Sequence, residues 1–276
     1  MNPTAWAGSA TVGMATRARW ALIDGLAAAE RLITKLKHEP ASIALTLGAP
    51  VVLVVIFGYI FGSAIKVPDG GNYREYLVPG LYVTIAANIL PPMVTMARDS
   101  TRGVVDRFRS MPINRAVVPF GQATATAIYG LANFLLMALC GLAVGWRIHR
   151  GAGYALIALA LLVAFQIAMT WVGMYLGLLI GNEEAAAQTG IVIFPITMVS
   201  NVFVPTSGMP AWLRLLADWN PVSALATAVR HLLGNPTPVN RAWPLEHPIA
   251  ASLAWTAVLL AIFIPLCTVR YARSRR

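Results

Sequence analysis

The most constraining feature of this sequence is a series of six long runs without a single Asp, Glu, Lys or Arg. A helix needs about 20 apolar residues to cross a bilayer, and every one of the six runs is long enough. Helices are expected in them because a helix satisfies its own backbone hydrogen bonds in lipid. The runs are residues 43–62, 77–97, 116–145, 151–181, 185–208 and 248–269.

The composition excludes a soluble globular protein and a disordered one. The chain is 58% hydrophobic and 12% charged, whereas soluble domains average roughly 45–50% apolar and about 25% charged residues. Too few charges remain to cover a soluble surface, and disorder requires low hydrophobicity. We therefore predict an all-α membrane protein with six transmembrane helices between residues 43 and 269. The fifth run contains Pro195 and Pro205, so its membrane part is expected to end near Val204.

The basic residues indicate how the chain is oriented. Fourteen of the 21 Lys and Arg residues lie before the first run, between the second and third runs, or after the last. Because cytoplasmic loops carry the excess of Lys and Arg, we expect both termini in the cytoplasm. This places a cytoplasmic N-terminal region at 1–42, a charged loop at 98–115, an outer loop at 206–247 and a basic cytoplasmic tail at 270–276.

Residues 18–37 are predicted to form an amphipathic elbow helix before the first span. Such a helix can lie in the membrane interface with its apolar side in lipid. It serves either as a contact for a cytoplasmic partner or as an anchor alone. The apolar side consists of Leu22, Leu26, Ala29, Ile33 and Leu36, and the polar side of Asp24, Arg31 and Lys35.

Several activities are excluded by missing residue patterns. The net charge of +10 could suggest nucleic-acid binding, but the basic residues lie at membrane edges, where they match lipid headgroups. A P-loop needs a lysine after a glycine, and none of Lys35, Lys37 and Lys66 follows one. We thus expect no ATP-binding motif, no catalytic residues and no nucleic-acid partner for this chain.

The histidines and cysteines do not form a metal-binding pattern. The four histidines are far apart in the sequence, and Cys140 and Cys267 both lie inside predicted spans, where cysteine behaves as a small apolar residue. No metal site is therefore expected. The spans also contain no ionisable base, which argues against a membrane enzyme acting on lipid.

The same scarcity of charge bears on the energy source. Ion-driven carriers keep Asp, Glu, His or Arg at membrane depth to bind and release the ion. If this chain moves a solute uphill, its energy source is expected on another chain. An ATPase-independent secondary carrier or channel remains the alternative.

The loop at 98–115 is the most charged stretch. Asp99 and Arg102, Arg102 and Asp106, and Asp106 and Arg109 have the spacing of neighbours on a helix, and Pro112 ends that helix. Val105 and Phe108 give it an apolar side. The loop is either a handle for a cytoplasmic protein or a solvated loop of the positive-inside type.

The residues of this loop also carry a resemblance. Residues 99–115 (Asp-Ser-Thr-Arg-Gly-Val-Val-Asp-Arg-Phe-Arg-Ser-Met-Pro-Ile-Asn-Arg) resemble the cytoplasmic loop of type-2 ATP-binding-cassette (ABC) exporter permeases of the daunorubicin-resistance type. Further matching segments are 76–81 (Tyr-Leu-Val-Pro-Gly-Leu), 203–205 (Phe-Val-Pro), 209–213 (Met-Pro-Ala-Trp-Leu) and 220–225 (Asn-Pro-Val-Ser-Ala-Leu), followed by Arg230. The resemblance covers nearly the whole chain.

The resemblance implies a subunit of an ATP-driven exporter. ATP and Mg²⁺ would bind to a separate P-loop ATPase subunit, and a second six-helix half would complete a homo- or heterodimer in a bacterial plasma membrane. A short re-entrant helix containing Trp212 and Trp219 would cap the outer mouth, although an interfacial anchor would have the same residues. Coupling to the ATPase would involve Asp99, Arg102, Gly103, Asp106, Arg107, Phe108 and Arg109, with Glu183 and Glu184 as a second contact or an ordinary charged turn.

The resemblance also implies a substrate path along the dimer interface. Its substrate would be an antibiotic, a drug or another lipophilic or lipid-like molecule. Met, aromatic and amide side chains suit such molecules, although helix packing would use the same residue types. The candidates are Thr84, Asn88 and Met93 in the second span and Thr197, Asn201 and Phe203 in the fifth.

Overall fold

The computed structural model describes residues 48, 52–61, 72–101, 117–238 and 242–273. The chain divides into two compact units, residues 1–43 and 44–276, and all described residues belong to the second. Every element in the described ranges is helical. The predicted elbow helix at 18–37 and most of the charged loop lie outside these residues.

Four stretches of the described residues are long and apolar enough to cross a membrane. They are Tyr73–Ser100, Pro119–Ala143, Ala152–Ile180 and Pro248–Tyr271, and they match the second, third, fourth and sixth charge-free runs. The helices that form them are α3 (Tyr73–Ala86), α4 (Leu90–Thr101), α6 (Val117–Ala143), α7 (Ala152–Ile180) and α12 (Pro248–Arg273). The prediction of an all-α membrane protein is confirmed at this level.

The first and fifth runs stay predictions as membrane spans. The first run is described only in part, and the π-helix η1 (Ile56–Phe61) lies in it. The fifth run forms α8 (Glu183–Met198), which has 16 residues and therefore does not reach the length of the other four. The total of six spans is thus still a prediction.

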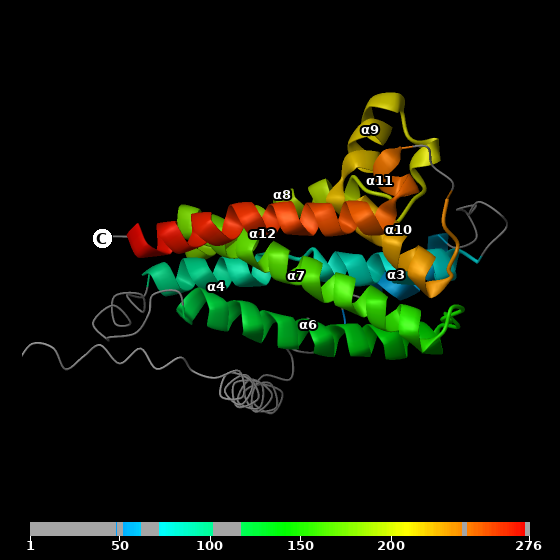
Figure 1. Ribbon diagram of the computed structural model, residues 1–276, viewed down its shortest axis with the longest axis horizontal. Helices are drawn as coiled ribbons and strands as arrows, with labels where there is room; N and C mark the ends of the chain where they lie inside the picture. The colour runs from blue at the N-terminus through cyan, green and yellow to red at the C-terminus, as the bar shows by residue number, and fades with distance from the viewer. Residues whose placement is uncertain (1–47, 49–51, 62–71, 102–116, 239–241, 274–276) are drawn as a thin grey trace, which may run out of the picture. The chain divides into compact units, whose positions relative to one another are not determined.

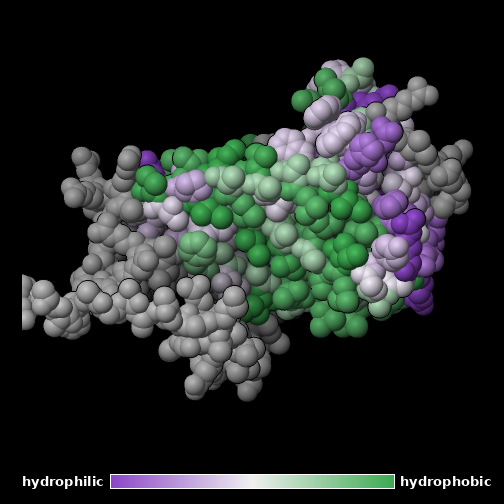
Figure 2. Space-filling model, in the orientation of Figure 1, coloured by the Kyte–Doolittle hydropathy of each residue, from purple (hydrophilic) through white to green (hydrophobic). Residues whose placement is uncertain are grey.

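Helix α7 is the centre of the bundle. It packs against α4, α12, α6, α10, α3 and α8, and Figure 1 shows it running between α12 and α4. In the most apolar 18 residues of Tyr73–Ser100, 67% of the positions are buried. The corresponding share is 22% for Pro119–Ala143 in α6 and 17% for Pro248–Tyr271 in α12. Figure 2 shows apolar side chains over the helical bundle and hydrophilic ones gathered at one end. Helices α6 and α12 therefore supply much of the exposed apolar surface of the bundle.

The two ends of the bundle carry different features, which serve to name them. We call the end that holds Thr101, Glu183 and Arg273 the Glu183 end. The opposite end holds α9 (Ala211–Trp219), α10 (Pro221–Leu233) and α11 (Trp243–Glu246), and we call it the Arg230 end. Figure 1 shows α9, α10 and α11 together with α3 at that end.

The second run is not one continuous helix. It consists of α3 and α4, which are separated at residues 87–89. The Asn88 side chain accepts a hydrogen bond from the Leu90 N–H at 3.2 Å, so it caps the start of α4. Pro91 and Pro92 follow, and their missing N–H groups suit the first turn of a helix better than its interior.

The fifth helix ends earlier than the sequence predicts. Helix α8 ends at Met198 rather than near Val204, and residues 199–204 are irregular before the short 3₁₀ helix η3 (Thr206–Gly208). Ser200 donates from its N–H to the Met198 carbonyl at 2.8 Å, which is a turn and not a further helical step. The helix therefore continues through Pro195 and ends close to the polar Ser200 and Asn201, before Pro205.

Candidate functional site

The predicted coupling residues lie at the Glu183 end where the structure describes them. Asp99 belongs to the last turn of α4, and Glu183 and Glu184 open α8. Arg102, Gly103, Asp106, Arg107, Phe108 and Arg109 lie outside the described residues.

The turn between α7 and α8 is built by strong local signals. Gly181 ends α7 in the left-handed conformation, at φ 60°, which glycine adopts without strain. Asn182 then caps α8, because its Oδ1 accepts hydrogen bonds from the Glu184 N–H at 2.8 Å and the Ala185 N–H at 3.1 Å. Two acidic residues in the first turn of α8 also suit the positive end of the helix dipole. This turn therefore follows directly from the sequence.

An ion pair joins α4 to this turn. The Arg98 Nε donates to Glu183 Oε1 at 2.8 Å, and Arg98 Nη2 contacts the same oxygen. The two side chains are 44% and 33% exposed, so the pair lies at the surface. The loop predicted at 98–115 includes Arg98, but the spacing of its charges does not indicate this partner. The pair connects the helix that leads into the charged loop with the start of α8.

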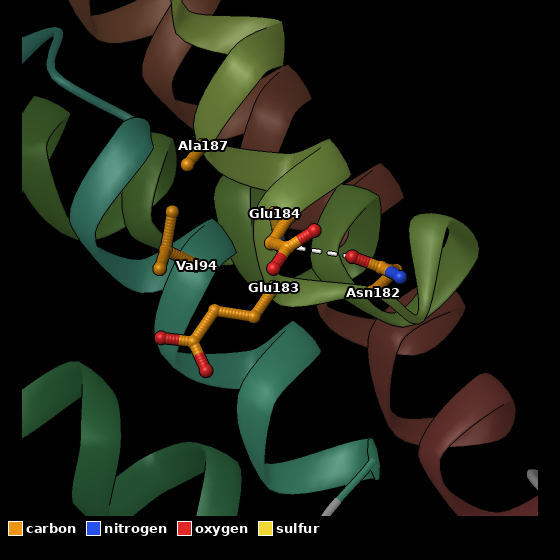
Figure 3. Close-up of a pocket in the computed structure, with 5 residues that line it drawn as sticks. All are labelled: Val94, Asn182, Glu183, Glu184 and Ala187. Atoms are coloured by element: carbon orange, nitrogen blue, oxygen red, sulfur yellow. Dashed lines mark hydrogen bonds between the residues drawn. The ribbon is translucent and has the colours of Figure 1, made fainter.

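An open cavity of about 650 Å³ lies beside this ion pair. Figure 3 shows its lining: Val94 from α4 and Asn182, Glu183, Glu184 and Ala187 from the turn and α8. The hollow has an apolar side and two carboxylates, and it forms on a chain with a net charge of +10. In the ranges that the structure describes, no group of three His, Cys, Asp or Glu could hold a metal ion.

Two glycines of α7 allow the chain at the start of α4 to pack closely against it. A Cβ atom at Gly173 would lie 2.5 Å from the Ile89 carbonyl oxygen, and one at Gly177 would lie 2.3 Å from that of Met93. Both distances are shorter than any van der Waals contact. The backbones of α4 and α7 can approach so closely only because these positions lack side chains. The start of α4 therefore packs directly on the backbone of α7.

The structure does not bring the six predicted path residues into one place. Met93 is fully buried among Ala97 and Ala186 toward the Glu183 end. Thr84 donates to the Gly80 carbonyl at 3.2 Å, and Thr197 is half-buried in α8. Asn88 has an exposed side chain at the break between α3 and α4. Their role in a path stays a prediction.

The other two path candidates lie in the irregular segment 199–204. Asn201 is 4% and Phe203 is 5% exposed. The Asn201 amide donates to Thr227 Oγ1 at 2.8 Å, and the Phe203 ring lies 4.8 Å from the Phe57 ring centroid. Within this chain both side chains thus have partners, and their role in a path also stays a prediction.

Arg230, which falls within the predicted outer loop at 206–247, is fully buried, and the sequence did not predict this. Arg230 lies in α10, a helix that packs against α3, α7 and α12. A local signal for this helix exists: Asn220 caps its start, Pro221 occupies its first position and Gly234 ends it at φ 76°. That order is typical of a helix. The burial itself has no local signal.

Polar side-chain contacts near the surface connect several elements at the Arg230 end. His149 lies 3.2 Å from a Glu75 carboxylate oxygen, and Arg150 Nη1 lies 3.4 Å from the His231 ring. Partial burial and the neighbouring Arg150 guanidinium lower the pKa of His231. The loop between α6 and α7 is thereby linked to α3 and α10.

Comparison with known proteins agrees with these features. The family model described as "ABC-2 type transporter" matches residues 26–233. A daunorubicin resistance ABC transporter permease protein, DrrB1, from Streptomyces coeruleorubidus is 28% identical over 89% of this chain and 84% of its own. A probable doxorubicin resistance ABC transporter permease protein, DrrC, from Mycobacterium tuberculosis is 23% identical over 95% and 93%. A putative transport permease, ycf38, from Porphyra purpurea is 24% identical over 75% and 72%.

Proposed function

Since this chain belongs to the ABC-2 type transporter family and is a membrane subunit of an ABC exporter, we propose that its Glu183 end docks the partner ATPase and that two six-helix halves form the path. The family implies an ATPase partner, and the relatives are permease subunits rather than ATPases. The chain is accordingly a multi-pass protein of the plasma membrane. The observation that carries the docking proposal is the surface at which the Arg98–Glu183 pair, the cavity and the start of the charged loop meet.

Docking at this end would couple the ATPase to the spans. ATP with Mg²⁺, bound to the partner, would supply the energy for closing the paired ATPases. The residues of this chain would receive that movement: loop 98–115 in a cleft of the ATPase, and Glu183 and Glu184 against a basic side chain of it. Because Gly173 and Gly177 allow α4 to pack directly on the backbone of α7, the movement would reach the centre of the bundle. The two halves would then open outward.

The Glu183 end would accordingly face the cytoplasm, with both termini on that side. Support comes from Arg98 and Arg270, which lie at the ends of α4 and α12 nearest to it. This agrees with the excess of basic residues on cytoplasmic segments. The Arg230 end, with α9, would lie at the outer surface.

The proposed substrate is a lipophilic, drug-like molecule. Two of the relatives are named for resistance to daunorubicin and doxorubicin. The surfaces from the first, second and fifth runs offer exposed Tyr59, Asn88 and Val192. Such a mixture of aromatic, amide and aliphatic groups suits an amphipathic solute. A second copy of this chain, or a related permease, would cover these surfaces and close the path.

Reversing one charge in the proposed docking loop is expected to release the ATPase. With Asp106→Arg or Arg109→Glu, the amount of ATPase that co-purifies with the membrane subunit should fall about tenfold, because a misplaced charge in a contact opposes binding strongly. ATP-driven daunorubicin uptake into inverted vesicles should fall with it. The amount of inserted membrane subunit should stay unchanged.

The matched control for Arg109→Glu is Arg270→Glu, which makes the same change of charge at the exposed end of α12. This variant should retain both the ATPase and the uptake. Full ATPase binding by the Asp106 and Arg109 variants would contradict the docking proposal. If neither the wild type nor any variant transports daunorubicin although the wild type binds the ATPase, only the proposed substrate class is contradicted.

A further inference from the structure

A fully buried arginine lies at the Arg230 end without an acidic partner. The Arg230 side chain is 0% exposed, and no carboxylate in the described ranges forms an ion pair with it. Removing a guanidinium from water is costly unless its N–H groups are hydrogen-bonded. The partners that replace water therefore show what this residue holds.

Backbone carbonyls and one aromatic ring surround the guanidinium. Arg230 Nε donates to the Tyr76 carbonyl at 3.0 Å. Its Nη2 donates to the Asn201 carbonyl at 3.0 Å and the Val202 carbonyl at 2.9 Å, and Nη1 reaches Asn201 Oδ1 at 3.3 Å. The guanidinium carbon lies 3.7 Å from the centroid of the Tyr76 ring. The arrangement uses the planar, forked geometry that distinguishes arginine from lysine.

These bonds join three parts of the chain that are far apart in sequence. The Tyr76 hydroxyl donates to the Asn201 carbonyl, and the Tyr73 hydroxyl donates to the Phe203 carbonyl at 2.8 Å. Thus α3 supplies the tyrosines, α10 supplies Arg230, and the irregular segment 199–204 supplies the carbonyls. We call Tyr73, Tyr76, Asn201, Val202 and Arg230 the Arg230 clasp.

A glycine lets α3 come close enough to complete the clasp. A Cβ atom at Gly80 would lie 2.7 Å from the Val202 carbonyl oxygen and 3.1 Å from Arg230 Nη2. Even alanine would push the segment away from α3. Gly80 belongs to the segment 76–81 and Arg230 follows the segment 220–225, so sequence segments that carried the family resemblance meet at this one site.

Converging carbonyls at a broken helix have a known use in transporters. In carriers driven by ions, backbone carbonyls in the unwound parts of discontinuous helices coordinate the driving ion. Here the carbonyls of Tyr76, Asn201 and Val202 instead surround a cation that is part of the chain. The segment after α8 can therefore keep its shape without binding an ion, which suits a subunit driven by a separate ATPase.

We propose that Arg230 is a positioning residue for transport: its guanidinium takes the place of a bound cation and keeps α3, segment 199–204 and α10 in one fixed arrangement. The outer end of the fifth run then moves together with α3 when the halves open. The role in transport rests on the proposed function, but the fixed arrangement does not.

The arrangement can be tested by a distance measurement that needs no substrate. Spin labels would replace the exposed Val204 and Ile148, in full-length protein whose Cys140 and Cys267 are changed to alanine. The wild type should give one narrow distance distribution, the same in sodium, potassium or N-methylglucamine chloride. In Arg230→Lys and Arg230→Gln the distribution should be about twofold broader, because neither side chain reproduces the fork.

Two further variants keep the test decisive. Gly80→Ala, which leaves Arg230 intact, should broaden the distribution in the same way, and it decides the matter if Arg230→Gln does not fold. Arg147→Lys, the same conservative change at an exposed arginine whose side chain donates to the nearby Leu142 and Trp146 carbonyls, should leave it narrow. The proposal is overturned if Arg230→Lys and Gly80→Ala lower only the melting temperature and keep the wild-type distribution. A wild-type distribution that depends on sodium would also overturn it.

The transport role is measured in the complex with the ATPase. ATP-driven daunorubicin uptake per folded complex should fall about tenfold in Arg230→Lys, as expected when a coupling interaction of ordinary size is lost, while ATPase binding is retained. Unchanged uptake in this variant would contradict the transport role. Absence of uptake in the wild type would speak against the proposed substrate, and the distance distributions would still decide the clasp.

Discussion

Replacing Gly177 with leucine is expected to prevent the helical bundle from forming. A Cβ atom at this position lies 2.3 Å from the Met93 carbonyl oxygen and 3.1 Å from the Met96 Cβ. A backbone oxygen and a Cβ atom are fixed by the helix, so neither can rotate away as the end of a flexible side chain can. Alanine alone should cost roughly 3 kcal/mol or more, the upper range for an overpacked core, and leucine more still. The melting temperature and the monodisperse fraction in detergent would measure the loss.

Gly153 provides the matched control for this change. It lies on the same helix, α7, and a Cβ atom there meets nothing within 4 Å. Gly153→Ala and Gly153→Leu should therefore leave the melting temperature almost unchanged. A Gly177→Leu protein as stable as the Gly153 variants would show that α4 and α7 do not pack as closely as described.

Reversing the charges of the Arg98–Glu183 pair should separate its role in coupling from its small role in stability. An exposed ion pair contributes about 0–1 kcal/mol to stability, so Arg98→Glu and Glu183→Arg should each fold normally. Each should nevertheless reduce ATP-driven export about tenfold, the size of an ordinary coupling energy. The reason is that like charges would now separate the end of α4 from the start of α8, on either side of the proposed docking surface.

The double variant Arg98→Glu/Glu183→Arg is the decisive member of this set. It restores an attractive pair with the charges exchanged, and export should recover to within about threefold of the wild type, because coupled residues show non-additive effects. Export would be measured in vesicles that contain the ATPase, with the amount of bound ATPase as a second readout. Equal loss in the single and double variants would mean that each side chain acts independently and that the pair itself has no role.

The membrane-spanning part of the fold was largely predictable. Four charge-free runs coincide with the four candidate spans, because crossing a bilayer depends on length and apolarity, and both are local properties. The internal breaks were not predictable to the same degree. The end of α8 at Met198 depends on Asn201 and its neighbours finding partners on α3 and α10.

The candidate site was also predictable only in its local features. Gly181, Asn182 and the two glutamates define the turn between α7 and α8 through capping, which is a local effect. The pairing of Arg98 with Glu183 joins residues 85 positions apart, and the cavity exists only because α4 lies beside that turn. The sequence therefore predicted the acidic turn but not the surface to which it belongs.

The sequence by itself determined the class of this protein, its apolar spans and the loop by which the family is recognised. Each of these depends on the transfer of a continuous stretch between water and lipid, or on a motif within about twenty residues. The tertiary structure decided where the polar groups go. Arg230 bonds a carbonyl 154 positions away, and only the folded bundle replaces its water with carbonyls, turning an apparent loop charge into the buried centre of the Arg230 clasp.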